Sequence, residues 1–218
     1  MASVRDALWS ALDAAVDVVT RPEVAGAWDQ PSALDGLTVG GLVAHLLVAA
    51  ERTALVLETE APSAAGVRIV TIPEFYGPNR IDDAADLADG MPALLRQGAT
   101  ARADQGVDAV LAEVAALPVR LRGVVDGAGD DRLVPVIQVR GGAARLDDYL
   151  VTRVIELVVH TDDVACSVGL AVPEIPADVF AWVAPAFVEL AVARSGSRAV
   201  VRAFTRRERA DADVLRVL

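Results

Sequence analysis

The sequence predicts an all-α protein, a four-helix bundle that carries a short helical C-terminal extension. Three observations support this fold class. Apolar residues recur every three or four positions over several long stretches, which is the spacing of a buried helix face. Residues suited to helix ends bracket these stretches. Finally, 54% of the residues are hydrophobic but only 4% are aromatic, so the core must consist mainly of Ala, Val and Leu, which suits close helix packing.

The first two bundle helices are predicted from their apolar stripes and their N-caps. Residues 3–20 show a helical apolar stripe that follows Ser3, a suitable N-cap. Residues 21–36 hold two prolines and Trp28, and they predict an irregular connection. Thr38 then caps a second helix, which continues to about Glu60 and has an apolar face formed by Leu42, Leu46, Ala49 and Val56.

The middle of the chain alternates between breaker-rich and helical composition. Residues 61–79 predict a long loop over the bundle, in which residues 67–72 have an extended conformation as an alternative. A third helical region spans residues 82–125, and Gly90, Pro92, Gly106 and Pro118 divide it into two or more helices. Residues 123–145 are rich in Gly and Asp, and residues 133–139 within them predict a short strand or a small β-hairpin.

The fourth bundle helix is the clearest element, and further helices follow it. Residues 147–168 begin with acids, which suit a helix N-terminus, and Gly169 follows as a natural stop. A helix over residues 178–194 and a last helical piece with Arg202, Arg206, Arg207 and Arg209 come next. We therefore expect residues 1–172 to form the bundle and residues 173–218 to pack on it as a helical extension.

Charge and motif content exclude several classes of function. The formal net charge is −11, which argues against a nucleic-acid-binding face. The arginines at 202–209 are the exception; a solvated helix face is the simpler interpretation, and a site for an anionic substrate or an acidic partner is the alternative. No glycine-rich phosphate loop is present. The single cysteine, Cys166, excludes an intramolecular disulfide, and we interpret it as a small core residue rather than a nucleophile.

The sequence also bears on location and assembly. The first twenty residues do not show the basic and then apolar pattern of a signal peptide, and we find no uninterrupted apolar stretch of about 18–20 residues. We therefore expect a cytoplasmic protein without membrane or nucleic-acid partners. An Ala/Val-rich bundle is compatible with a homodimer, although no residue pattern specifies one.

The two histidines of the chain suggest a metal site. His45 borders the apolar stripe of the second helix, and His160 lies four residues after Glu156 in the fourth. Side chains at i and i+4 of a helix share one face, so both can reach one ion. Facing helices of bundles commonly supply carboxylate and histidine ligands. Two histidines and one glutamate leave a coordination position open, as in catalytic zinc sites.

A polar line surrounds the second of these histidines. Tyr149, Arg153, Glu156, His160 and Asp163 fall along one side of an otherwise apolar helix. Such a line is either a solvated stripe or an interior site in which Arg153 and Asp163 orient the ligands. An E-x-x-x-H spacing also occurs by chance as an exposed pair, so the spacing alone leaves both interpretations open.

Two segments resemble a known family. Residues 37–46 (LTVGGLVAHL) resemble the first metal-ligand helix of the mycothiol-dependent maleylpyruvate isomerase N-terminal domain family, which belongs to the DinB-like superfamily. Residues 147–165 (DDYLVTRVIELVVHTDDVA) resemble the last bundle helix of that family, with its R-x-x-E-x-x-x-H-x-x-D pattern. The resemblance covers roughly residues 5–170 and implies a DinB-like four-helix bundle.

The resemblance also implies a site and a chemistry. His45, Glu156 and His160 would be the ligands of a divalent metal, usually zinc, with Arg153 and Asp163 at matching positions next to them. The function implied is that of an enzyme that uses a low-molecular-weight thiol such as mycothiol for transfer to, or isomerisation or detoxification of, a small electrophile. The alternative is a non-catalytic metal- or ligand-binding module, such as a sensor or partner-binding protein.

The chain departs from the isomerase in one respect that matters for function. The isomerase has a C-terminal domain that contributes to substrate handling, whereas here about 45 residues follow the bundle and they are predicted to be helical. The isomerase reaction itself therefore does not follow from the resemblance.

Overall fold

The computed structural model describes residues 2–77, 90–137, 139–209 and 211–218. Within them the chain is mostly helical, with one small sheet, which confirms the all-α prediction and is consistent with a DinB-like fold. The predicted start of the third helical region, at residue 82, lies outside the described residues.

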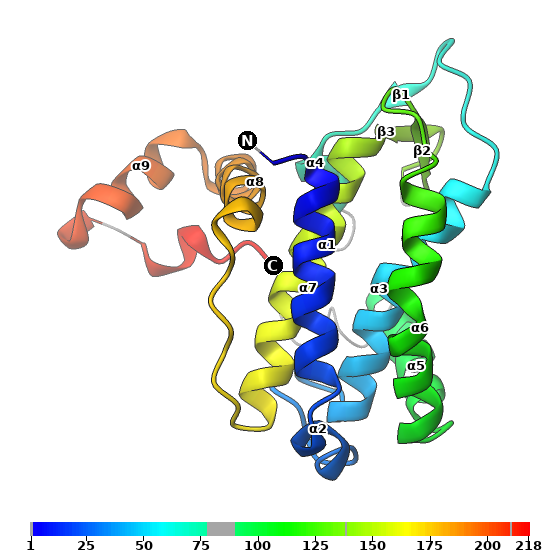
Figure 1. Cartoon of the computed structure of the whole chain (residues 1–218). Helices are drawn as coiled ribbons and strands as arrows, with labels where there is room; N and C mark the ends of the chain where they lie inside the picture. The colour runs from blue at the N-terminus through cyan, green and yellow to red at the C-terminus, as the bar shows by residue number, and fades with distance from the viewer. Residues whose placement is uncertain (1, 78–89, 138, 210) are drawn as a thin grey trace.

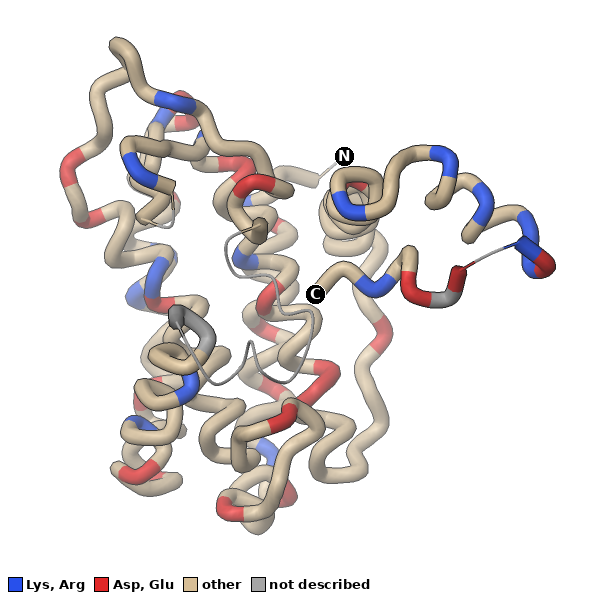
Figure 2. The backbone as a smooth tube through the Cα atoms, turned by 180° about the vertical axis from the view of Figure 1, so that it is seen from behind, with Lys and Arg blue, Asp and Glu red and all other residues tan. Residues whose placement is uncertain are grey.

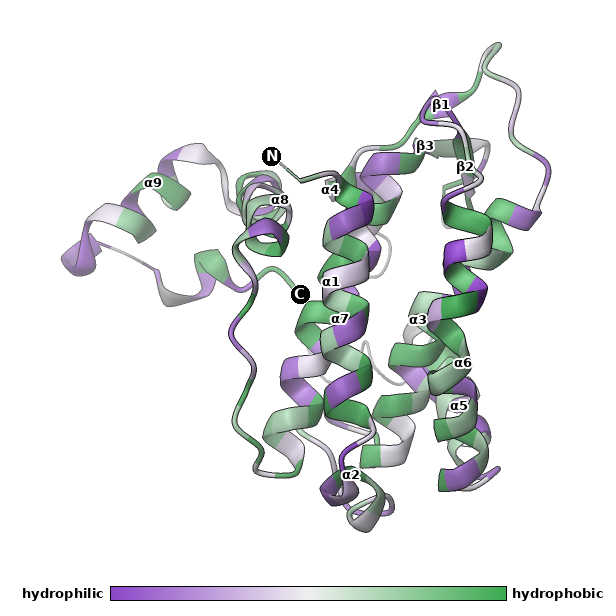
Figure 3. Cartoon of the chain, viewed as in Figure 1, coloured by the Kyte–Doolittle hydropathy of each residue, from purple (hydrophilic) through white to green (hydrophobic). Residues whose placement is uncertain are grey.

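Four long helices form the bundle, and Figure 1 shows them side by side. They are α1 (Val4–Val19), α3 (Val39–Glu58), α6 (Val107–Val125) and α7 (Leu146–Ser167). Each of them packs against two of the others, and α5 (Gly90–Ala103) covers α3 from outside the bundle. Figure 3 shows that hydrophobic segments run through all four bundle helices. The core that they enclose is built mainly from Val, Leu and Ala, as the composition predicted.

The predicted N-caps hold the first two of these helices. Ser3 accepts a hydrogen bond from the Asp6 amide, and the Asp6 carboxylate accepts one in return from the Ser3 amide. Thr38 accepts a hydrogen bond from the Gly41 amide at 3.0 Å. Each cap satisfies amide groups that would otherwise lack a partner at the helix N-terminus.

The connection before α3 contains more structure than the sequence predicted. A one-turn helix, α2 (Pro22–Gly26), begins with proline, whose fixed backbone angle suits the first helical position. Trp28 then packs against the first turn of α3, so closely that a Cβ on Gly40 would lie 2.4 Å from its ring. Its indole nitrogen donates to the carbonyl of Ala103 at 3.3 Å, which ties this connection to the end of α5.

A three-stranded sheet lies at one end of the bundle. β2 (Leu133–Val136) and β3 (Gly142–Arg145) form the predicted hairpin, and β1 (Arg68–Ile69) pairs in parallel with β3 in the order β1-β3-β2. The prediction of a long loop over residues 61–79 was wrong for the short helix α4 (Ile72–Tyr76), whereas β1 lies within residues 67–72, for which an extended conformation was the alternative. Thr71 and Glu74 form a capping box that starts α4, a local signal that the composition of the segment obscured.

The C-terminal residues form a helical layer beside the bundle. α8 (Ala177–Ser195) packs against α1, α4 and α7, and α9 (Ser197–Thr205) folds back on α8 after a bend of 120°. The short 3-10 helices η3 (Arg207–Arg209) and η4 (Ala212–Leu215) complete this layer. The arginines at 202, 206, 207 and 209 are exposed, as expected for a solvated face, and Figure 2 shows basic residues repeated along α9.

Cys166 is exposed and lies 3.8 Å from the Asp162 carboxylate, so its assignment to the core was wrong. It belongs to the outer face of the last turns of α7, which no other described element covers at this point.

Among the described helices, α3 is long and apolar enough to cross a membrane by length and composition, and the bent pair α8–α9 passes the same test only if it is counted as one span. However, 67% of the apolar window of α3 is buried inside the bundle.

Candidate metal centre

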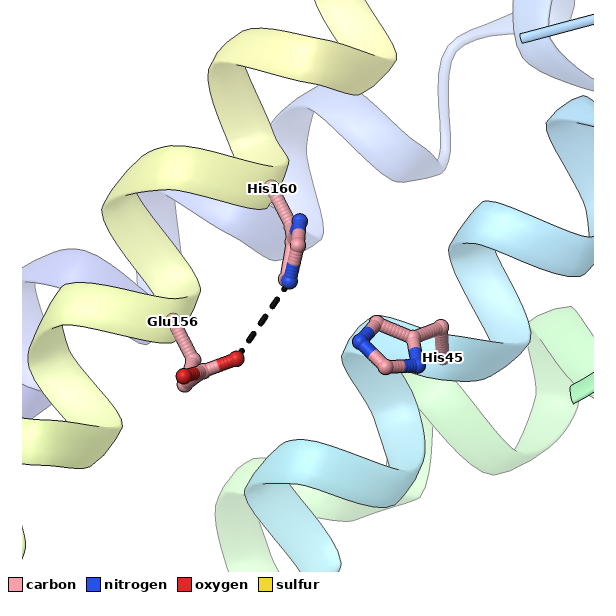
Figure 4. Close-up of side chains that lie close together, drawn as sticks. All are labelled: His45, Glu156 and His160. Atoms are coloured by element: carbon pink, nitrogen blue, oxygen red, sulfur yellow. Dashed lines mark ion pairs between the residues drawn. The ribbon is translucent and has the colours of Figure 1, made fainter. Parts of the chain in front are cut away.

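His45, Glu156 and His160 meet in the space between α3 and α7. One potential ligand atom from each lies within 4.8 Å of the other two, and Figure 4 shows the three side chains pointing toward one another from the two helices. Nε2 of His160 lies 3.3 Å from Oε2 of Glu156. The rings of His45 and His160 are arranged edge to face, with centroids 4.8 Å apart and an interplanar angle of 80°.

The local sequence explains why these side chains point inward. Glu156 and His160 are one helical turn apart on α7, so they project from the same face. His45 lies in the second turn of α3, where the residues on both sides of it in the chain, Ala44 and Leu46, are buried in the core. The packing of α3 on α7 then places the imidazole opposite the Glu156–His160 pair.

The environment of His45 favours the neutral imidazole. Burial and, to a smaller extent, the nearby charge of His160 lower the pKa of His45 to about 4. At neutral pH the ring therefore carries a free nitrogen lone pair. A metal ligand needs that lone pair.

Glu156 and His160 form an ion pair in the metal-free protein. Burial raises the pKa of Glu156, but hydrogen bonding to His160 and the charge of Arg153 outweigh it and bring the pKa to about 2. Burial lowers the pKa of His160, but hydrogen bonds to Asp163 and Glu156 outweigh it and raise the pKa to about 9. At neutral pH His160 is therefore protonated and Glu156 is ionised, and a proton lies between Nε2 of His160 and the carboxylate. A metal cation bound by the same two groups would take the place of that proton.

The two residues predicted to orient the ligands differ in what they touch. Oδ2 of Asp163 lies 3.0 Å from Nδ1 of His160, so Asp163 fixes the ring and leaves Nε2 facing Glu156. Arg153 is buried and makes no hydrogen bond to the three candidate ligands. Its guanidinium donates to Oγ1 of Thr152 and to the carbonyl of Ala49, and it influences Glu156 through its charge.

Tyr76 contacts the site through its hydroxyl group. Its hydroxyl lies 3.0 Å from Oε1 of Glu156 and 3.2 Å from the carbonyl of Thr152. Burial, together with the Glu156 carboxylate, keeps the pKa of Tyr76 well above its ordinary value, so the hydroxyl stays protonated and can donate. The capping box of α4, which positions this tyrosine, was the signal in the sequence that pointed to an ordered segment here.

A comparison with known protein families matches residues 5–165 to the mycothiol maleylpyruvate isomerase N-terminal domain. The chain belongs to this family. The match runs from the first turn of α1 almost to the end of α7, so it includes both helices that carry the three side chains. No curated protein and no solved structure matches the chain.

A cavity of about 490 Å³ opens beside the candidate centre of this family member. Its described lining includes all three candidate ligands, and apolar residues of α3, α4, α7 and α8 form much of the rest. Val217 and Leu218 also contribute, so the C-terminal layer forms part of the wall. The candidate centre is therefore next to a space large enough for small molecules.

The donor set fits a divalent cation of intermediate softness. Two imidazoles and one carboxylate are typical ligands of zinc, and as a set of three they leave a position for a further ligand. The hydrogen bond from Nδ1 of His160 to Asp163 is the arrangement commonly found behind a metal-bound histidine. Tyr76 occupies Oε1 of Glu156, and Oε2 faces the two histidines.

Proposed function

We propose that this protein is a metal-dependent enzyme, with zinc as the metal, that uses a low-molecular-weight thiol such as mycothiol to act on a small electrophile. The observation that carries the proposal is the convergence of His45, Glu156 and His160 at the wall of a 490 Å³ cavity. Membership of a family named for a mycothiol-dependent isomerase supports the choice of thiol. Transfer, isomerisation and detoxification of the electrophile all fit this description, and a cytoplasmic location suits a low-molecular-weight thiol.

The three side chains would hold the metal through Nε2 of His160, Oε2 of Glu156 and a ring nitrogen of His45. Bound there, a divalent cation would supply a Lewis acid and lower the pKa of a thiol in its open position, so that the nucleophile forms near neutral pH without a separate base.

The remaining residues prepare the site for this chemistry. Asp163 accepts a hydrogen bond from Nδ1 of His160 and so holds the ring in one orientation. Tyr76 donates to Glu156 and restricts that carboxylate to one free oxygen. Together with the apolar part of the cavity wall, a bound electrophile would exclude water from this space, and polar interactions with the charged groups there would then be stronger.

Metal content of the purified protein tests the first half of the proposal. We expect about one equivalent of zinc in the wild type and its loss in His45→Ala and His160→Ala. Asp162→Ala serves as the matched control, because Asp162 is an exposed acid on the same helix that is not among the three side chains. A folded wild type that stays metal-free after incubation with zinc would overturn the proposal.

Thiol binding tests the second half. Replacement of zinc by cobalt(II) makes the site visible, and a thiolate that joins the cobalt adds an intense near-ultraviolet band. We expect mycothiol to produce this band in the wild type and not in His160→Ala. If cobalt binds but neither mycothiol nor any other small thiol changes its spectrum, the protein is a metal-binding module without thiol chemistry.

A further inference from the structure

Arginines are concentrated at the cavity beside the candidate metal centre. Arg52, Arg96, Arg153 and Arg194 all belong to its described lining, although the chain as a whole carries a net charge of −11. The carboxylates among the same lining residues are Glu156 and Asp163, and both are hydrogen-bonded to His160. The described lining therefore holds four guanidinium groups and two side-chain carboxylates, so positive charge exceeds negative charge at the cavity wall.

Two of these arginines are already engaged elsewhere. Arg96 donates from Nε to the carbonyl of Asp35 at 3.3 Å, and Arg194 donates to the carbonyl of Arg216 at 2.9 Å. Their charges still contribute to the potential in the cavity. They are less suited to close contact with a ligand, because part of each guanidinium already donates to a backbone carbonyl.

Arg52 differs from them. It lies on α3 seven residues after His45, and its side chain is half-buried. It makes no hydrogen bond and no ion pair with any residue that the structure describes. Burial lowers its pKa, and the charge of Arg153 lowers it further, so the guanidinium is held in a place that disfavours a cation.

Arg153 lies on α7, which packs against the helix that carries Arg52. Its separation from His160 in the sequence has the same length as that of Arg52 from His45 but the opposite direction. Arg153 comes seven residues before His160, and α3 and α7 run in opposite directions (Figure 1). The two histidines thus meet at one level of the helix pair, and the two arginines lie on the same pair of helices at a level two turns away. Arg153 uses Nε and Nη1 for Thr152 and Ala49, and its Nη2 makes no hydrogen bond within the described part of the chain.

Two neighbouring cations are unfavourable in a partly buried site when, as for Arg52 and Arg153 among the described residues, no carboxylate forms an ion-pair contact with them and the charge of Glu156 acts only from a distance. Removal of a charge from water has a large cost unless a counter-charge and hydrogen bonds replace the water. A planar guanidinium with free N–H groups matches a carboxylate in shape and in charge. A ligand that brings its own negative charge would provide the missing partner.

We propose that Arg52, supported by Arg153, binds an anionic group of the carboxylate type on the small electrophile that enters the cavity. The assignment of that molecule as a substrate rests on the proposed function. The anion subsite itself consists of residues of the chain and does not require a metal.

Benzoate and its neutral isostere benzamide provide a direct test in the metal-free protein. We expect calorimetric titration to show that benzoate binds the wild type and that Arg52→Gln weakens this binding about tenfold or more. Benzamide should bind both proteins equally. Arg21→Gln is the matched control, because it removes the same charge from an exposed ion pair with Asp17 on α1 and should leave benzoate binding unchanged.

A second variant separates binding from folding. Arg52→Lys keeps the charge but loses the forked geometry, so benzoate affinity should fall between those of the wild type and Arg52→Gln. Equal benzoate affinity in the wild type and Arg52→Gln, or benzamide binding as tight as benzoate binding in the wild type, would overturn the inference.

The same titrations separate this inference from the proposed function. Arg52-dependent benzoate binding in a protein that takes up no zinc would uphold the anion subsite and refute the metalloenzyme. Zinc uptake by a protein in which Arg52→Gln leaves benzoate binding unchanged would refute the anion subsite and uphold the metal site. Benzoate binding that survives excess mycothiol assigns the anionic group to the electrophile, whereas displacement by mycothiol would overturn that assignment.

Discussion

His45 and His160 face each other edge to face across the α3–α7 interface, with ring centroids 4.8 Å apart, although 115 positions separate them in the sequence. Their environments give them opposite charge states in the metal-free protein. The pKa of His45 is lowered to about 4, chiefly by burial, while that of His160 is raised to about 9 against the effect of burial by Asp163 and Glu156. One ring is thus ready to bind a cation, and the other must first lose a proton.

Zinc binding should therefore release a proton. In the metal-free protein His160 is protonated at pH 7.5, because its pKa is about 9, and a metal at Nε2 must displace that proton. We expect release of about one proton at pH 7.5 and a zinc affinity that rises about tenfold per pH unit up to about pH 9. Calorimetry in two buffers of different ionisation enthalpy measures the number of protons.

Asp163→Asn is the informative variant for this prediction. Loss of the carboxylate removes a hydrogen bond that raises the pKa of His160, so fewer protons should be released at pH 8. Zinc affinity should also fall, by about 10- to 100-fold. A binding enthalpy of the wild type that does not depend on the buffer would contradict the proton displacement.

Tyr76→Phe should weaken metal binding while leaving the fold intact. The variant removes the hydrogen bond to Oε1 of Glu156 and keeps the ring, which packs edge to face on Phe75. We expect about a tenfold or greater loss of zinc affinity, measured by competition with a chromophoric chelator. Tyr149→Phe is a suitable control, because this buried tyrosine on α7 is not hydrogen-bonded to a candidate ligand through its hydroxyl. Equal losses in both variants would argue against a specific role for Tyr76.

Acid should destabilise the metal-free protein through His45. The folded-state pKa of about 4 lies below the unfolded value of 6.5, so the unfolded chain binds a proton that the folded protein excludes. The stability contributed by this difference is present above pH 6.5 and is lost as the pH falls toward 4, at about 1.4 kcal/mol per pH unit. Urea unfolding at pH 7, 6 and 5 with EDTA should show a shallower decline for His45→Gln. Parallel declines for the two proteins would show that His45 is not the group responsible.

Removal of the metal should lower the melting temperature. A ligand present at about 100 times its dissociation constant stabilises the folded state by about 2.7 kcal/mol, which corresponds to roughly 5–11 °C for a chain of this size. We expect EDTA to lower the melting temperature of the wild type by this amount and zinc to restore it. His160→Ala should respond to neither, and an equal response in that variant would place the metal elsewhere.

Gly40→Ala should destabilise the fold by about 1–3 kcal/mol, because the added Cβ would lie 2.4 Å from the Trp28 ring and the first turn of α3 would have to move. Gly123→Ala on α6 is the matched control. Apart from the adjacent backbone of α6, no atom of the described residues lies within 4 Å of a Cβ at that exposed helical position, so the variant should be stabilised by about 0.5–1 kcal/mol. Chemical denaturation measures both, and effects of the same sign would contradict this account.

The sequence by itself determined the bundle helices and their beginnings. Helical periodicity and N-caps depend on residues within about four positions of one another, so Ser3 and Thr38 could be identified as caps without a structure. The hairpin at β2 was predicted on the same local basis. The E-x-x-x-H spacing and the resemblance to the family also singled out His45, Glu156 and His160, and their role as ligands of a metal stays a prediction.

Only the tertiary structure decided which distant residues meet. It brings Tyr76 to Glu156, sets Arg52 beside Arg153, pairs β1 with β3, and leaves Cys166 on the surface. Each of these depends on which helix face is covered by which neighbour, and on how far one helix is shifted along another. Sequence periodicity reveals that a helix has a buried face, but the partner of that face is chosen by the packing of the whole chain.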